Sequence, residues 1–129
     1  MSIPSARDNS LAVQPVVGSV LVKTSDMARS VAWYCTLLGR SVPEAPYPPI
    51  VSIPLENTIL LLDSIGDGPA EPSPHALFAF DSVDIDRSLE HLRQLGVRIV
   101  GEDIERFPDV AFITVQDPDG HLLMVVQSF

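Results

Sequence analysis

The chain has 129 residues, a net charge of −9 and 46% hydrophobic residues, which suits one domain with a buried core. An acidic surface repels phosphate backbones, which argues against nucleic acid as a partner. No apolar run reaches the roughly 18 residues that a membrane span needs, and the single cysteine rules out an intrachain disulfide, so we expect a cytoplasmic protein with no membrane partner.

The N-terminal segment, residues 1–14, mixes Ser, Pro, Arg, Asp and Asn and lacks a basic stretch followed by an apolar one. It therefore reads as a flexible arm rather than a signal peptide, and we expect a single domain over residues 15–129. The segment Val16–Lys23 is apolar and rich in β-branched residues, which predicts the first strand.

A helix is expected to follow this strand. Ser25 or Thr24 can cap a helix that begins near Asp26, whose carboxylate suits the positive end of the helix dipole. Gly39 is placed to end the helix in a left-handed conformation. About three strands should follow, and the last two are Ile50–Leu55 and Thr58–Asp63, joined by a turn at Glu56-Asn57.

The pattern then restarts after a Gly- and Pro-rich linker, residues 66–74. A strand is predicted at His75–Asp81, and a helix at Asp84–Leu95 that Gly96 ends. The remaining predicted strands are Val97–Gly101, Val110–Gln116 and His121–Gln127, the last two joined by the tight turn Asp117-Pro118-Asp119-Gly120.

The two halves form a tandem repeat. Asp26-Met27-Ala28-Arg29-Ser30 matches Asp84-Ile85-Asp86-Arg87-Ser88, and a Leu-Gly pair follows each at nearly equal distance. Each half therefore reads as a strand, a capped helix, a glycine stop and about three strands. We predict an α+β fold of two tandem βαβββ modules, at about residues 15–66 and 74–129, which form a curved mixed sheet, an incomplete barrel, around a cleft.

Side-chain alternation indicates which face of the sheet forms this cleft. In the last predicted strand, Leu123 and Val125 point away from Leu122, Met124 and Val126. The first strands of both halves alternate in the same way. One face of the sheet is uniformly apolar and should lie under the helices. The other face is mixed, and a mixed concave face suits a ligand.

Three segments resemble the vicinal oxygen chelate superfamily, which includes glyoxalase I, extradiol dioxygenases, fosfomycin-resistance enzymes and bleomycin-resistance proteins. They are SVLVKTSDMARSVAWYCTLLGR, LFAFDSVDIDRSLEHLRQLGV and DPDGHLLMVV. The resemblance implies paired βαβββ modules whose sheets curve into a cleft, and it implies a homodimer as the common assembly.

In metal-dependent members of this family, four strand side chains, usually His, Glu or Gln, bind a divalent ion. Carried over by position from the two helix-opening aspartates and the turn glycine, three of these ligands fall on Ser19, Leu77 and Met124. The fourth falls within Thr58–Leu62, which holds no His, Glu or Gln. None of these side chains is a useful ligand, so we expect neither a metal nor a cofactor.

The expected function is therefore that of the bleomycin-resistance branch, which binds a small organic molecule without a metal and without turnover. The ligand, a drug or a metabolite, should contact a cleft lined by Ser19, Leu21, His75, Leu77, Ala79, Leu122 and Met124, with Phe107 as an aromatic lip. No catalytic residue is predicted, because no nucleophile, base and orienting group assemble. Two alternatives stay open: a metal-dependent lyase, isomerase or dioxygenase of the same superfamily, and a non-catalytic dimeric scaffold.

Other polar and aromatic residues have simpler explanations. His75 takes the position of a metal ligand if the strand register shifts by two residues. Otherwise it belongs to the loop that leads into the strand. The remaining candidates are expected to serve structure: His91 on a solvated helix face, His121, Asp117 and Asp119 in a turn, and Tyr34 and Cys35 in the core.

Overall fold

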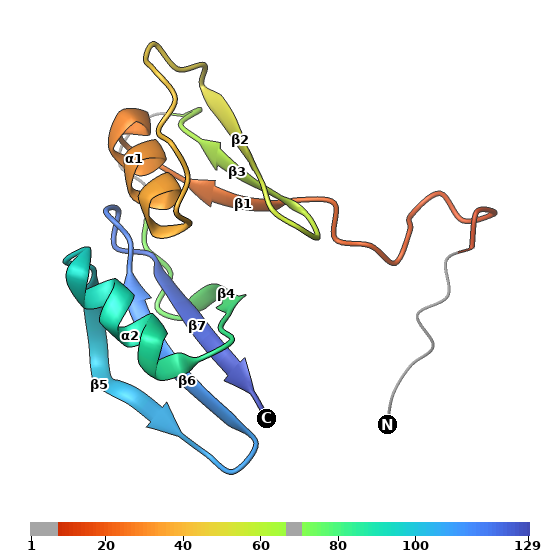
Figure 1. Cartoon of the computed structure of the whole chain (residues 1–129). Coiled ribbons are helices and arrows are strands. Elements are labelled where there is room, and N and C mark those ends of the chain that lie inside the picture. The colour runs from red at the N-terminus through yellow and green to blue at the C-terminus, as the bar shows by residue number, and fades with distance from the viewer. Residues whose placement is uncertain (1–7, 67–70) are drawn as a thin grey trace.

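The computed structural model describes residues 8–66 and 71–129, and the predicted arm and linker lie partly outside them. Within these residues the chain forms two successive modules (Figure 1). The first holds β1 (Val20–Lys23), α1 (Met27–Leu37), β2 (Ile50–Pro54) and β3 (Ile59–Asp63). The second holds β4 (Ala76–Asp81), α2 (Ile85–Gln94), β5 (Arg98–Arg106), β6 (Val110–Gln116) and β7 (Leu122–Ser128).

Each module builds its own sheet, with its helix packed on one face (Figure 1). The strand order is β1-β3-β2 in the first sheet and β4-β7-β6-β5 in the second. In both sheets the first strand of the module lies at the edge and pairs in parallel with the last strand. The repeat therefore extends to topology, and the predicted α+β fold with open curved sheets is confirmed.

The first module has two strands after its helix, so the expected third strand is wrong there. Residues 41–49 contain no strand. This segment holds the four prolines Pro43, Pro46, Pro48 and Pro49. Each proline removes a backbone N–H that a sheet ladder needs, so the segment crosses the module as a loop.

The first strand is also shorter than predicted. β1 begins at Val20, where its pairing with β3 begins opposite Leu60. The residues before it extend away from the two modules (Figure 1), and Val17 is 67% exposed. Residues 16–19 have the composition of a strand, but in this register β3 begins at Ile59, opposite Ser19, so residues 16–18 have no residue of β3 to pair with.

The helix caps repeat in both modules, although the cap residue differs from the prediction. Asp26 and not Ser25 or Thr24 is the N-cap of α1, and its carboxylate accepts a hydrogen bond from the Arg29 N–H at 3.1 Å. Asp84 caps α2 in the same way. Gly39 and Gly96 end the two helices with φ of +68° and +70°, as predicted.

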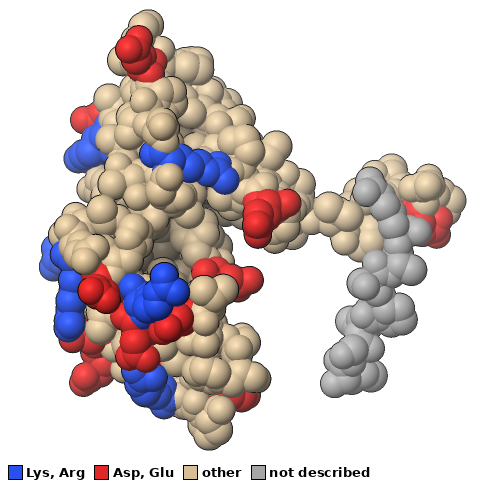
Figure 2. Space-filling view, viewed as in Figure 1, with Lys and Arg blue, Asp and Glu red and all other residues tan. Residues whose placement is uncertain are grey.

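The core lies between each helix and the inner face of its sheet, as the alternation predicts. Leu123 and Val125 are buried, whereas Leu122 and Met124 are half-buried on the other face. Charged side chains of both signs gather over α2 and β5 (Figure 2). Neither helix in the described part of the chain is long and apolar enough to cross a membrane.

Candidate functional site

The predicted cleft residues of the second module gather on the open face of its sheet. Ala79 of β4 lies opposite Met124 of β7, and Met124 lies opposite Thr114 of β6. Leu122 lies two residues before Met124 on the same strand. Phe107 follows β5 and stacks on Phe112 of β6 with ring centroids 5.9 Å apart, so the predicted lip borders this face.

Ser19, Leu21 and His75 lie outside this group. Ser19 and Leu21 belong to the first module, where Leu21 is 62% exposed on the open face opposite Leu61. Leu77 is 40% exposed in β4. His75 precedes that strand and is exposed. No strand pair joins the two sheets within the described residues, so the two halves of the predicted cleft are on separate sheets.

A groove of about 750 Å³ separates the modules. One wall comes from β4, where Phe78 to Asp81 face the groove, and the rings of Phe78 and Phe80 meet edge to face with centroids 5.1 Å apart. The other wall comes from the first module: Val16, Val17, Val20, Leu38, Arg40, Leu55, Glu56, Asn57 and Thr58. Of the predicted cleft residues, Ala79 lines this groove.

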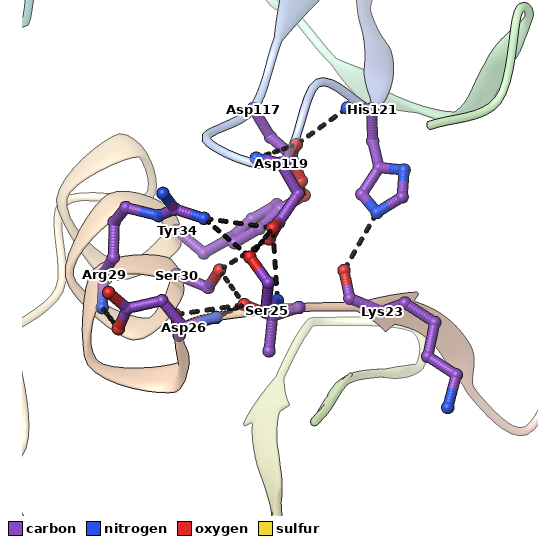
Figure 3. A network of polar contacts seen from close by, with 10 residues as sticks. Lys23, Ser25, Asp26, Arg29, Ser30, Tyr34, Asp117, Asp119 and His121 are labelled. Carbon is purple, nitrogen blue, oxygen red and sulfur yellow. Dashed lines mark hydrogen bonds and ion pairs between the residues drawn. The ribbon is translucent and has the colours of Figure 1, made fainter. Parts of the chain in front are cut away.

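A cluster of polar side chains, Ser25, Arg29, Ser30, Tyr34, Asp117, Asp119 and His121, joins the two modules (Figure 3). We call it the inter-module cluster. The carboxylate of Asp119 accepts hydrogen bonds from the Ser25 N–H at 3.1 Å, the Ser25 hydroxyl and the Arg29 guanidinium at 3.0 Å. Burial opposes the ionised form of Asp119. The hydrogen bonds from Ser25 and the charge of Arg29 outweigh it, so the pKa of this carboxyl lies below its usual value.

The second contact of the inter-module cluster is a buried phenol. The Tyr34 hydroxyl donates a 2.7 Å hydrogen bond to Asp117 Oδ2, and Tyr34 is completely buried. Burial raises the pKa of Tyr34 well above its usual value, and the charge of Asp117 adds to the effect. The phenol therefore stays protonated and keeps its role as a donor.

His121 completes the inter-module cluster. It is 4% exposed, and its Nε2 lies 2.9 Å from the Lys23 carbonyl oxygen at the end of β1. A carbonyl only accepts, so Nε2 carries the proton. The sequence interpretation of Asp117, Asp119 and His121 as simple turn residues missed these contacts. The sequence held one signal of these contacts: three polar side chains occur in one short turn, in a chain whose strands are otherwise rich in apolar residues.

Two further residues, His91 and Cys35, were expected to serve structure. His91 is exposed, as expected, and its Nε2 also lies 3.0 Å from the Leu37 carbonyl oxygen, which links α2 to the end of α1. Cys35 is buried, as expected of a packed residue. Burial raises the pKa of its thiol, although Arg40 acts in the opposite direction, so the thiol is a poor nucleophile.

Solved structures of low sequence identity share this fold. A glyoxalase/bleomycin resistance protein from Catenulispora Acidiphila DSM 44928 matches with a TM-score of 0.64 and 23% identity, over 88% of this chain and 99% of that chain. Oxidase ChaP-H1 matches with a TM-score of 0.67 and 22% identity, over 88% and 95%. Lactoylglutathione lyase from Agrobacterium tumefaciens matches with a TM-score of 0.66 and 16% identity, over 87% and 92%. No curated protein sequence matches the chain.

A family model extends the likeness from fold to sequence. The model described as Glyoxalase/Bleomycin resistance protein/Dioxygenase superfamily matches residues 16–125. The match begins just before β1 and ends within β7, so it includes both modules. The chain belongs to the Glyoxalase/Bleomycin resistance protein/Dioxygenase superfamily.

Proposed function

We propose that this protein is a cytoplasmic, metal-free member of the superfamily that binds a small organic molecule in the groove between its modules and releases it unchanged. The groove supports this proposal, because its volume of about 750 Å³ lies in the range of small-molecule sites. Eight of its lining residues are apolar and five are polar, and apolar walls with a smaller number of polar groups are the usual composition of such a site.

The residues that stand at the family's metal-ligand positions do not fit a divalent ion. Ser19 and Leu77 occupy two of these positions, and Met124 occupies a third where a carboxylate is expected. Hard divalent cations need carboxylate, imidazole or amide ligands. Within residues 8–66 and 71–129, no three His, Cys, Asp or Glu side chains lie close enough together to hold a metal ion. We therefore derive no metal-dependent step.

Binding can be tested with 6-propionyl-2-dimethylaminonaphthalene, a neutral naphthalene dye whose fluorescence reports an apolar site. Val17 lines the groove and is 67% exposed, so Val17→Asp should leave the fold intact. The bound dye would have to displace water from a charge on this wall. We therefore expect the dissociation constant of the dye to rise about tenfold. Fluorescence titration measures the change.

The matched control is Val13→Asp, which places the same charge on an exposed valine outside the groove. The dissociation constant of the dye for this control should stay within about twofold of the wild-type value. Equal affinities for the wild type and Val17→Asp would overturn the groove as the binding site. Stoichiometric Zn, Ni, Mn or Fe in the purified untagged protein would overturn the metal-free reading.

We also propose that the protein forms a homodimer. The support is apolar side chains exposed on both sheets: Leu21 of β1 is 62% exposed, Leu77 of β4 is 40% exposed, and Phe107 after β5 is 54% exposed. Apolar side chains that cluster on exposed faces mark interaction sites in soluble proteins. Sedimentation velocity at micromolar concentration should give twice the 14.0 kDa chain mass. A single species of the chain mass would contradict the proposal.

A further inference from the structure

We propose that the groove binds an extended peptide segment, which adds as a strand to the free edge of β4. This inference rests on the proposed function, because it names the chemical class of the ligand. It follows from three features of the groove: the strand edge that borders it, the apolar residues that line it and the charged residues that line it.

The edge of β4, rather than one of its faces, borders the groove. Four successive residues, Phe78 to Asp81, line it. Successive side chains in a strand point to opposite faces, so a groove over one face would be lined by alternate residues only. β4 is the outermost strand of its sheet and pairs with β7 alone, so this edge has no strand partner in the part of the chain that the structure describes.

The backbone groups that face the groove can be assigned. The Ser82 N–H donates to the Val126 carbonyl oxygen at 2.8 Å, so Ser82 points its backbone toward β7. Backbone groups alternate between the two edges of a strand. The N–H and C=O groups of Ala79 and Asp81 therefore point into the groove. A peptide backbone presents donors and acceptors at the spacing that these groups require.

The walls of the groove suit the side chains of such a segment. Phe78 and Phe80 lie along β4, and Val17 and Val20 lie on the opposite wall. The four lining residues of β4 span about 13 Å, which matches four residues of an added strand. A tetrapeptide with mostly apolar side chains fits this length.

The acidic residues that line the groove favour a basic residue in the peptide. Asp81 and Glu56 line the groove, and neither forms an ion pair with another described residue. Arg40, the positive group of the groove, donates to the Pro54 carbonyl oxygen. The chain as a whole carries a net charge of −9, which adds to the attraction for a cationic peptide.

The test uses the capped tetrapeptide Val-Lys-Val-Val and two derivatives with N-methyl groups on alternate amides. Only alternate N–H groups of an added strand face β4. One methylation pattern should therefore weaken binding at least about tenfold, while the other changes it less than about twofold. Calorimetric titration measures both, and equal effects of the two patterns would overturn strand addition.

A variant tests the same contact from the protein side. Ala79→Pro removes the N–H that points into the groove and leaves the bonds to β7, since proline is tolerated where the N–H faces outward on an edge strand. We expect peptide affinity to fall at least about tenfold. Ala79→Val, which keeps the N–H, should bind the peptide like the wild type.

The outcomes separate this inference from the proposed function. Dye binding to the wild type without peptide binding would overturn the peptide inference and leave small-molecule binding standing. No binding of either probe would overturn both. If Ala79→Pro does not fold, the two methylated peptides still decide the question with the wild-type protein.

Discussion

Replacing Asp119 by alanine is expected to lower the free energy of unfolding by about 2–3 kcal/mol, because it removes a buried carboxylate that accepts several hydrogen bonds. The Asp119 side chain is only 3% exposed and accepts hydrogen bonds from Ser25 and Arg29 of the other module. Its loss leaves the Ser25 N–H at the start of α1 without this partner. Urea unfolding followed by circular dichroism measures the change.

The matched control is Asp103→Ala, which also breaks an Arg–Asp ion pair. Both partners of that pair, Arg93 and Asp103, are more than half exposed. Pairs of this kind contribute about 0–1 kcal/mol, so the control should change little. Equal losses in the two variants would show that the inter-module cluster contributes no more than a surface pair.

Acid should reduce the difference in unfolding free energy between the wild type and Asp119→Ala. The pKa of Asp119 is lowered in the folded chain. Its carboxylate therefore stabilises the fold above the unfolded pKa of about 3.9, and this contribution is lost as the pH falls through the lower folded pKa. The two unfolding free energies should converge below about pH 4, and a constant gap down to the acid transition would contradict this assignment.

Replacing Leu123 by alanine is expected to cost about 2–5 kcal/mol of unfolding free energy, because it removes a fully buried side chain and leaves a cavity. Leu123 lies on β7, which pairs with both β4 and β6, and its exposed fraction is 0%. Neighbouring core residues such as Ile113 and Val115 belong to the adjacent strand and cannot close the space without moving the sheet.

Leu21→Ala is the control for this variant. It makes the same chemical change in a strand, but the Leu21 side chain is 62% exposed and faces away from α1. Its loss should cost less than about 1 kcal/mol under conditions where the protein is monomeric. A cost at Leu21 equal to that at Leu123 would mean that the open face is buried in the folded species.

Local rules account for most of the fold. The apolar alternation, the left-handed glycines after each helix and the acidic caps are contained within a few residues of sequence, and each was found close to its predicted place. The missing strand after α1 has a local cause as well, since the four prolines of residues 41–49 were visible in the sequence. A third strand was expected in spite of them, because the two halves were predicted to repeat the same order of elements.

The contacts between modules could not be predicted in this way. Asp117 and Asp119 are explained locally by a tight turn, and nothing near them in sequence identifies Tyr34 or Ser25 as partners. These pairs are 83 and 94 residues apart, so only the packing of the modules reveals them. The groove has the same origin, because its walls come from segments that no local pattern connects.

The inter-module cluster also determines which helix the acidic turn can dock onto. In the repeat, Ser25 and Tyr34 of the first module correspond to Val83 and Leu92 of the second. The second module therefore lacks the two hydroxyl groups, of Ser25 and Tyr34, that contact Asp119 and Asp117, although Arg87 and Ser88 stand where the first module has Arg29 and Ser30. Two halves with the same backbone plan can be paired wrongly during folding. Ser25 and Tyr34, which only the first module has, distinguish the correct partner from its copy, so the two halves share a backbone plan but differ in the polar groups that pair them.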